Sequence, residues 1–315
     1  MKMKFLICLI VGFVAINSCT KHVYRVSGAV FPMIIAHRGG QLEMPENTLY
    51  AFKKAIELGV DGIELDVQLS KDSVPVLYHP SDLNIRTNGE GVISSFSVSA
   101  LRQFNAGYRF TLDQVVFPYR NMQQIDLHIP TLEEAFKCIP KHLFIIIDLK
   151  SLPAKPLVDA VFEVVDANHE WDRVLFYSTS DEHTAILTKE SRAIVFEPRN
   201  QTRSHLLQLM LNADCVRSSI YYPWVGFELR RTMTLVEKLQ LGQGSTEVDI
   251  HRLWNKKSMQ CIKGEAKSKS KVALFGINTE EDYRLALELG ADAIYTDCPE
   301  RMMKIRGQGK KRVIR

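Results

Sequence analysis

Short apolar segments alternate along this chain with stretches in which apolar residues recur every three or four positions. Residues 33–36 form an uninterrupted apolar run, which is typical of a buried strand. Residues 49–58 place their apolar side chains on one helical face, and a glycine follows at position 59, where a helix would end. Because strands that alternate with helices usually belong to parallel sheets, the pattern predicts an α/β fold.

The same alternation continues to the end of the chain. Strands are expected at 63–69, 74–78, 144–149, 174–177, 193–196, 216–222, 272–277 and 293–295, and helices at 156–165, 181–189, 204–211, 236–241 and 279–289. A further helix is expected to begin at residues 131–134. About eight such units fit a closed TIM (β/α)8 barrel, which typically takes about 250 residues, better than an open doubly wound sheet. No glycine-rich dinucleotide fingerprint follows the first strand, which also disfavours the Rossmann alternative.

Two regions depart from this alternation. Residues 80–128 have weaker periodicity and predict a small insertion after the third strand, with little regular core of its own. Residues 241–270 are polar and are expected to contain a loop. We therefore predict one barrel domain over residues 30–305, followed by a basic tail over 306–315 that is solvated and frayed.

The composition is that of an ordinary globular protein, with 46% hydrophobic and 24% charged residues among 315. The formal net charge of +4 is close to balance for this length. No basic stripe with interleaved aromatic residues is present, so nucleic acid is not an expected partner.

The N-terminus predicts export from the cytoplasm. Lys2 and Lys4 precede an apolar run over residues 5–16, which is too short for a stable membrane span and has the form of a signal peptide over residues 1–19. The sequence Ile-Asn-Ser-Cys that ends at Cys19 is similar to a bacterial lipoprotein processing site, which predicts a lipid anchor on Cys19. The alternative is plain secretion, with Cys19 as a free or disulfide-bonded cysteine.

Four cysteines follow the signal segment, at positions 138, 215, 261 and 298. None forms a C-x-x-C pair, so a zinc site is not expected. Their even number permits disulfides in an exported protein, but isolated buried thiols are the simpler expectation.

Polar groups gather where the first predicted strands end. His37 and His79 follow two of these strands, and a histidine can accept or donate a proton near neutral pH. Glu64 and Asp66 stand two apart on a strand, so they point to the same face, roughly 6.5–7 Å apart. Two such carboxylates predict an oxygen-ligand site for Mg²⁺ or Ca²⁺, the alternative being a solvent-facing acidic pair.

A second strand repeats this spacing with Asp148 and Lys150. Asp148 is a candidate third metal ligand and Lys150 a candidate phosphate contact, unless the two form only a buried ion pair. Arg38 offers a planar fork for a phosphate, with a surface salt bridge as the alternative. Asn47 is expected either to bind substrate or to cap the helix that follows.

These motifs resemble the glycerophosphodiester phosphodiesterase family. The resemblance rests on AHRGG, PENT and GVDGIELDVQLSKDSVPVLYH, and on the later blocks IPTLEEAF, IIIDLK and FGINTEEDYRLALELGADAIYTDCPE. It implies a TIM barrel of the phospholipase-C-like phosphodiesterase type, and hydrolysis of glycerophosphodiesters to sn-glycerol 3-phosphate and an alcohol with one divalent cation. It also implies roles for individual residues: His37 and His79 in acid–base catalysis, Arg38 and Lys150 in phosphate binding, and Glu64 and Asp66 in metal binding, with Asp148 as the third metal ligand at the place of a family glutamate.

The chain departs from the family pattern at three positions. Asp148 replaces the usual glutamate, which shortens the third ligand by one methylene. Pro80 replaces an aspartate that commonly follows the second histidine. Phe275 replaces a common tryptophan and can still present an apolar face to glycerol, although it lacks the indole N–H. Residues 200–270 match the pattern poorly.

The resulting hypothesis is an exported, metal-dependent phosphodiesterase. One alternative is a phosphodiesterase for a larger lipid, sugar or wall-polymer phosphodiester. The other is a barrel that binds a ligand without turnover. The sequence leaves the oligomeric state, the headgroup and the choice between Mg²⁺ and Ca²⁺ open.

Overall fold

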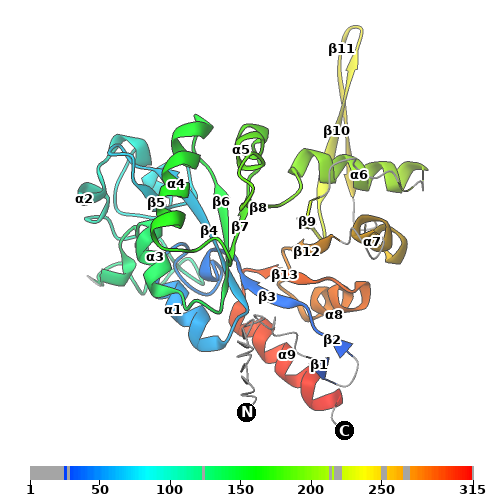
Figure 1. Ribbon diagram of the computed structural model, residues 1–315, viewed down its shortest axis with the longest axis horizontal. Coiled ribbons are helices and arrows are strands. Elements are labelled where there is room, and N and C mark those ends of the chain that lie inside the picture. The colour runs from blue at the N-terminus through cyan, green and yellow to red at the C-terminus, as the bar shows by residue number, and fades with distance from the viewer. Residues whose placement is uncertain are drawn as a thin grey trace, which may run out of the picture.

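The computed structural model describes residues 25–26, 29–122, 125–212, 215, 222–249, 254–264 and 270–313. The predicted signal segment and Cys19 lie outside these residues. Within them, a parallel barrel carries helices around its outside, as predicted (Figure 1). The eight barrel strands are β3 (Met33–Ala36), β4 (Gly62–Leu69), β6 (Phe144–Leu149), β7 (Val174–Tyr177), β8 (Ile194–Val195), β9 (Trp224–Glu228), β12 (Lys271–Phe275) and β13 (Ala293–Thr296).

Neighbouring strands run in the order β8-β7-β6-β4-β3-β13-β12-β9, and all of these pairs are parallel. A single bridge between Phe196 and Trp224 joins the two ends of this order. The barrel is therefore nearly closed, with its weakest seam between β8 and β9.

Helices connect the strands on the outside of the barrel. They are α1 (Leu49–Leu58), α3 (Leu132–Cys138), α4 (Ala154–Ala167), α5 (Asp181–Leu187), α6 (Arg199–Asn212), α7 (Lys256–Lys263), α8 (Glu280–Leu289) and α9 (Pro299–Val313). Local signals fix several of their ends. Thr131 and Glu134 form a capping box at the start of α3, and Gly59 and Gly290 end α1 and α8 in the left-handed conformation.

Alternate residues of the strands fill two separate cores. The larger core lies between strands and helices and includes Ile63, Leu65 and Val67 from β4. The smaller core fills the barrel interior with side chains such as Ile35, Ile146 and Leu175. Because apolar side chains fill both the barrel interior and the space under the helices, polar site residues are expected at the inward-facing positions near the strand ends.

The predicted third strand is not a barrel strand. β5 (Pro75–Leu77) pairs antiparallel with the end of β4 and lies outside the barrel order. Residues after it form η2 (Leu83–Ile85), η3 (Ile93–Ser95), α2 (Val98–Leu101) and η4 (Ile125–Leu127). The expectation of little core was wrong, because Tyr78, Leu83, Ile93, Leu101 and Ile129 belong to a buried cluster of their own.

The region after α6 differs most from the sequence prediction. The helix expected at 236–241 is wrong, since β10 (Thr232–Leu239) and β11 (Gly242–Asp249) form an antiparallel hairpin that projects from the barrel (Figure 1). The strand expected at 216–222 falls largely outside the described residues, and the barrel strand of this region is β9. The short strands β1 (Arg25–Val26) and β2 (Ala29–Val30) pair before the barrel begins.

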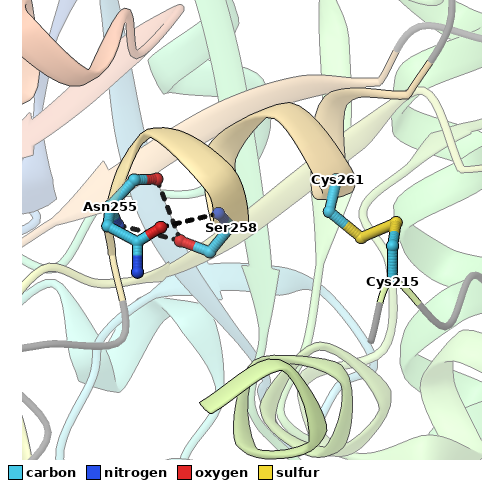
Figure 2. The surroundings of a disulfide bond; sticks show 4 residues. All are labelled: Cys215, Asn255, Ser258 and Cys261. Carbon is cyan, nitrogen blue, oxygen red and sulfur yellow. Dashed lines mark hydrogen bonds between the residues drawn. A yellow bond between two sulfur atoms is a disulfide. The ribbon is translucent and has the colours of Figure 1, made fainter. Parts of the chain in front are cut away.

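Two further expectations were wrong, one about the cysteines and one about the C-terminal tail. Cys215 and Cys261 form a disulfide that ties the segment after α6 to α7 (Figure 2), whereas Cys138 and Cys298 are free. The tail expected after residue 305 continues α9 as far as Val313. Arg306 is buried there, because its guanidinium pairs with Asp61 and donates to the Gly59 carbonyl.

Candidate active site

The candidate site lies at the carboxyl ends of the barrel strands. On β4, Leu65 and its outward neighbours pack under the helices, so Glu64 and Asp66 face the barrel interior. Asp148 is in register with Asp66 on the adjacent strand β6. This edge of a TIM barrel is where catalytic groups are normally found.

Three carboxylates meet there. Oxygens of Glu64, Asp66 and Asp148 lie within 4.8 Å of one another, and all three residues are buried. Burial, reinforced by Asp66, raises the pKa of Glu64 to about 8, and burial likewise raises the pKa of Asp148 to about 6 against the opposing effect of Lys150. These carboxyl groups therefore cannot all ionise easily without further positive charge.

Two cations already contact the cluster. The Lys150 Nζ lies 2.5 Å from Asp148 Oδ2 and 3.1 Å from Asp66 Oδ1. The Arg38 Nε lies 3.0 Å from Asp66 Oδ2, and the same guanidinium reaches Glu46 at 3.5 Å. Although burial opposes it, the charges of Lys150 and Arg38 hold the pKa of Asp66 below its usual range.

The donor set fits a divalent cation. Two cations, Lys150 and Arg38, contact the three buried carboxylates, whereas Glu46 has a further partner in Arg86. Asp148 Oδ1 also accepts no hydrogen bond from any described residue. An all-oxygen set of this kind suits Mg²⁺ or Ca²⁺. The shorter side chain of Asp148 does not prevent it from joining the cluster.

The turn after β3 brings Arg38 to the cluster. Arg38 has a φ of 54°, followed by 81° at Gly39 and 112° at Gly40. A Cβ on Gly39 would lie 2.8 Å from Ala51 Cβ, so the turn needs glycine there. In this conformation the Arg38 N–H donates to Glu64 at 2.9 Å.

Asn47 contacts Asp66 rather than capping α1. Its amide donates to Asp66 Oδ2 at 2.9 Å, and its carbonyl oxygen accepts from the Asp66 N–H at 3.1 Å. Thr48 is the residue that caps α1. Asn47 therefore orients Asp66, and a direct contact with substrate stays a prediction.

Asp297 holds His37, and the sequence analysis missed it. Asp297 Oδ1 lies 2.6 Å from His37 Nδ1, while Gln41 and Asn278 donate to the two oxygens of the same carboxylate at 2.7 Å. The imidazole Nε2 lies 3.7 Å from Glu64. The position of Asp297 directly after the last barrel strand was the available signal.

His79 reaches the site by a different route from the one predicted. β4 extends beyond the barrel, turns, and returns as β5, so the Tyr78 N–H donates to the Asp66 carbonyl at 3.1 Å. The histidines are therefore not at equivalent ends of barrel strands. Gln68 donates to the Tyr78 and Pro80 carbonyls at 2.8 and 2.9 Å, which fixes the segment on both sides of His79.

The two histidines have opposite pKa shifts. Burial, together with Arg38 and Lys150, lowers the pKa of His79 to about 4, which outweighs the effect of Asp66. Burial also acts on His37, but Glu64 and Asp297 outweigh it and raise its pKa. These opposite pKa shifts favour a neutral His79 and a protonated His37.

Aromatic side chains form the opposite wall of the barrel mouth. Phe275 lies between Tyr177 and Tyr295, with ring centroids 5.6 and 4.4 Å away. A Cβ on Gly226 would lie 2.4 Å from Phe275 Cζ, so this glycine provides the space for the ring. The site thus has an acidic, cation-binding half and an aromatic half.

The residues named from sequence are brought together here, apart from Cys19. His37, Arg38, Glu64, Asp66, Asp148 and Lys150 form one connected group, Asn47 holds Asp66, and Phe275 lies in the aromatic wall.

Among the described residues, no helix is long and apolar enough to cross a membrane.

The chain is similar to known proteins over most of its length. The model of the Glycerophosphoryl diester phosphodiesterase family matches residues 37–301. The uncharacterized protein Rv2277c of Mycobacterium tuberculosis is 41% identical over 269 residues, which are 85% of this chain and 87% of that protein. A glycerophosphodiester phosphodiesterase of Caldanaerobacter subterraneus is 28% identical over 279 residues, covering 88% of this chain and 98% of that protein.

Solved structures show the same fold. The crystal structure of the glycerophosphoryl diester phosphodiesterase domain of Rv2277c has a TM-score of 0.79 and 40% identity, and the match covers 88% of this chain and 99% of that one. An Oleispira antarctica phosphodiesterase, solved in complex with the product sn-glycerol-3-phosphate, has a TM-score of 0.64 and 22% identity, with 88% and 97% covered.

Proposed function

Because the chain belongs to the glycerophosphoryl diester phosphodiesterase family, we propose that it hydrolyses glycerophosphodiesters to sn-glycerol 3-phosphate and an alcohol, using one divalent cation. The observation that carries this proposal is the cluster of Glu64, Asp66 and Asp148, with His37 3.7 Å from Glu64 and with His79 under the electrostatic influence of Asp66. That the Oleispira relative was solved with sn-glycerol-3-phosphate supports the same product.

Glu64, Asp66 and Asp148 would hold the cation, which supplies positive charge for the phosphate oxygens. Arg38 and Lys150 border the same carboxylates and would bind the remaining phosphate charge. Asn47 keeps Asp66 in place through its two hydrogen bonds.

The histidines divide the proton transfers according to their pKa values. His79, neutral at pH 7, removes the proton from the attacking hydroxyl as the new oxygen–phosphorus bond forms. His37, protonated and oriented by Asp297, donates its proton to the alcohol oxygen as the old bond to phosphorus breaks. Attack by water and attack by the substrate's own neighbouring hydroxyl both fit this arrangement.

Replacement of either histidine tests this division directly. His37→Ala and His79→Ala should each lower kcat by about 10²–10⁴-fold, since each removes a proton-transfer group. The readout is release of glycerol 3-phosphate, with Glu280→Gln in an exposed pair of α8 as the control. Full activity in either histidine variant would exclude its assigned role.

Export with a lipid anchor on Cys19 remains part of the proposal. The Cys215–Cys261 disulfide supports export, because stable disulfides are typical of oxidising compartments. Metabolic labelling with a fatty acid, compared between the natural chain and Cys19→Ser, tests the anchor.

A further inference from the structure

A polar group of three residues lies in the barrel mouth beside Phe275 and has no part in the reaction described above. It consists of Tyr177 at the end of β7, Arg199 at the start of α6, and Glu228 at the end of β9. We refer to it as the β7–β9 subsite.

Strand register places this subsite next to the reacting groups. Tyr177 is in register with Asp148 on the adjacent strand, and Glu228 is in register with Phe275. Trp224 on β9 faces the barrel interior, and Glu228, four residues later, faces the same way. The Tyr177 ring also contacts Phe275, with centroids 5.6 Å apart.

The hydrogen bonds within the subsite leave one acceptor and one donor unused. Glu228 Oε1 accepts from both Arg199 and Arg231, whereas Oε2 is buried and accepts no hydrogen bond from any residue that the structure describes. A buried carboxylate oxygen without a donor is costly, so a ligand that supplies one is favoured there.

Tyr177 supplies the complementary group. Its hydroxyl accepts from Arg199 Nη1 at 3.1 Å, and no acceptor for its own proton is found among the described residues. An alcohol hydroxyl both donates and accepts, so it matches Glu228 and Tyr177 together. The quaternary ammonium group of choline donates no hydrogen bond. Its positive charge would also lie near two guanidinium groups, those of Arg199 and Arg231, and only one carboxylate, that of Glu228.

We propose that Tyr177 and Glu228, held by Arg199, bind the hydroxyl groups of a polyol headgroup, which makes diesters of glycerol or inositol better substrates than the choline diester. This inference rests on the proposed phosphodiesterase function and specifies its substrate class. Arg199 orients Glu228 and Tyr177, and the other two residues make the contacts.

The test compares Glu228→Gln and Tyr177→Phe with the unchanged protein on three substrates: glycerophosphoinositol, glycerophosphocholine and bis(p-nitrophenyl) phosphate. The unchanged protein should have the lower KM for the inositol diester. Each variant should raise that KM about tenfold or more, since a hydrogen bond to a charged or buried group is lost. The KM for the choline diester and the rate on bis(p-nitrophenyl) phosphate should stay nearly the same.

Glu281→Gln, in the exposed pair with Arg230, is the matched control. Retained turnover of bis(p-nitrophenyl) phosphate reports that a variant is folded. Equal KM changes for both glycerophosphodiesters, or no change for either, would overturn the headgroup assignment. Absence of hydrolysis of all three substrates by the unchanged protein would instead contradict the phosphodiesterase function itself.

Discussion

The charge of each histidine is set by a few neighbouring side chains. Asp297 accepts from His37 Nδ1 and, together with Glu64, raises the pKa of this imidazole against the effect of burial. Since His37 must carry a proton to act as the donor, activity should fall as pH rises through its raised pKa. Since His79 must be neutral, activity should also fall as pH drops toward about 4.

Asp297→Asn tests the positioning role of this carboxylate. The substitution removes one cause of the raised His37 pKa. It also allows the imidazole to carry its proton on the nitrogen that does not face the substrate, so kcat should fall about 10²-fold or more. The alkaline limit of the pH–rate profile should also move to lower pH, which a merely structural role would not cause. An unchanged profile with normal kcat would show that Asp297 does not act through His37.

Sequence reasoning found the residues that belong to a recognisable pattern and missed those that depend on tertiary contact. The sequence shows one of these residues directly after a predicted strand, His37, and three near the ends of strands, Glu64, Asp66 and Asp148. Because the ends of parallel strands meet at one edge of a barrel, it could be predicted that these side chains lie close together. Asp297 lies 260 residues from His37, and no spacing connects the two. Glu228 could not be found from the sequence either, because its strand lies within residues 200–270, which match the family pattern poorly.

At the scale of elements, the hairpin of β4 and β5 explains how His79 enters the site. β4 is longer than its barrel neighbour β3, and β5 pairs with the part of it that ends at Leu69. An apolar run of three to five residues does not reveal whether a strand is parallel or antiparallel. For the same reason the prediction of a third barrel strand was wrong, although His79, which follows this strand, does reach the site.

The helix predicted at 236–241 failed for a related reason. The segment has apolar residues at spacings that suit a helix, but it pairs with residues 242–249 as a hairpin. Strand pairing with a partner overrides a weak local preference. The longer, regular helices such as α1 and α8 were predicted because their caps and apolar faces agree.

Gly226 on β9 is a testable requirement of the aromatic wall. An added methyl group would lie 2.4 Å from Phe275 Cζ, so Gly226→Ala should displace this ring and cost about 1–3 kcal/mol of stability. We expect a lower thermal midpoint and a raised KM for glycerophosphodiesters. The control is Gly276→Ala, just after β12, where no atom lies within 4 Å of the added methyl group. This control adds backbone strain, because Gly276 has a φ of 75°, but it does not crowd the ring. If Gly226→Ala leaves both quantities unchanged, the ring does not need this space.

For the whole molecule, the Cys215–Cys261 disulfide ties the weakest part of the barrel wall. The two residues are 46 positions apart, and the loop they close contains β9 and the β10–β11 hairpin. Chain-entropy arguments assign about 4 kcal/mol to a loop of this length. A double Cys215→Ala, Cys261→Ala variant should therefore unfold at lower denaturant concentration, and a reducing agent should destabilise only the natural chain.

Equal denaturant midpoints for the natural and double-variant proteins would show that the disulfide does not stabilise this region. Cys138→Ala is the control, because that thiol is free. The sequence could not assign the pair, since the tertiary fold decides that Cys215 meets Cys261 on α7 (Figure 2).

The central claim is that Glu64, Asp66 and Asp148 bind a divalent cation on which hydrolysis depends. Phosphorus NMR of a defined glycerophosphodiester, incubated with EDTA-treated protein before and after addition of Mg²⁺ or Ca²⁺, tests it most directly. We predict glycerol 3-phosphate only after the metal is restored, and none with Asp66→Asn under any condition. Equal turnover with and without the metal, or full activity of Asp66→Asn, would contradict the account.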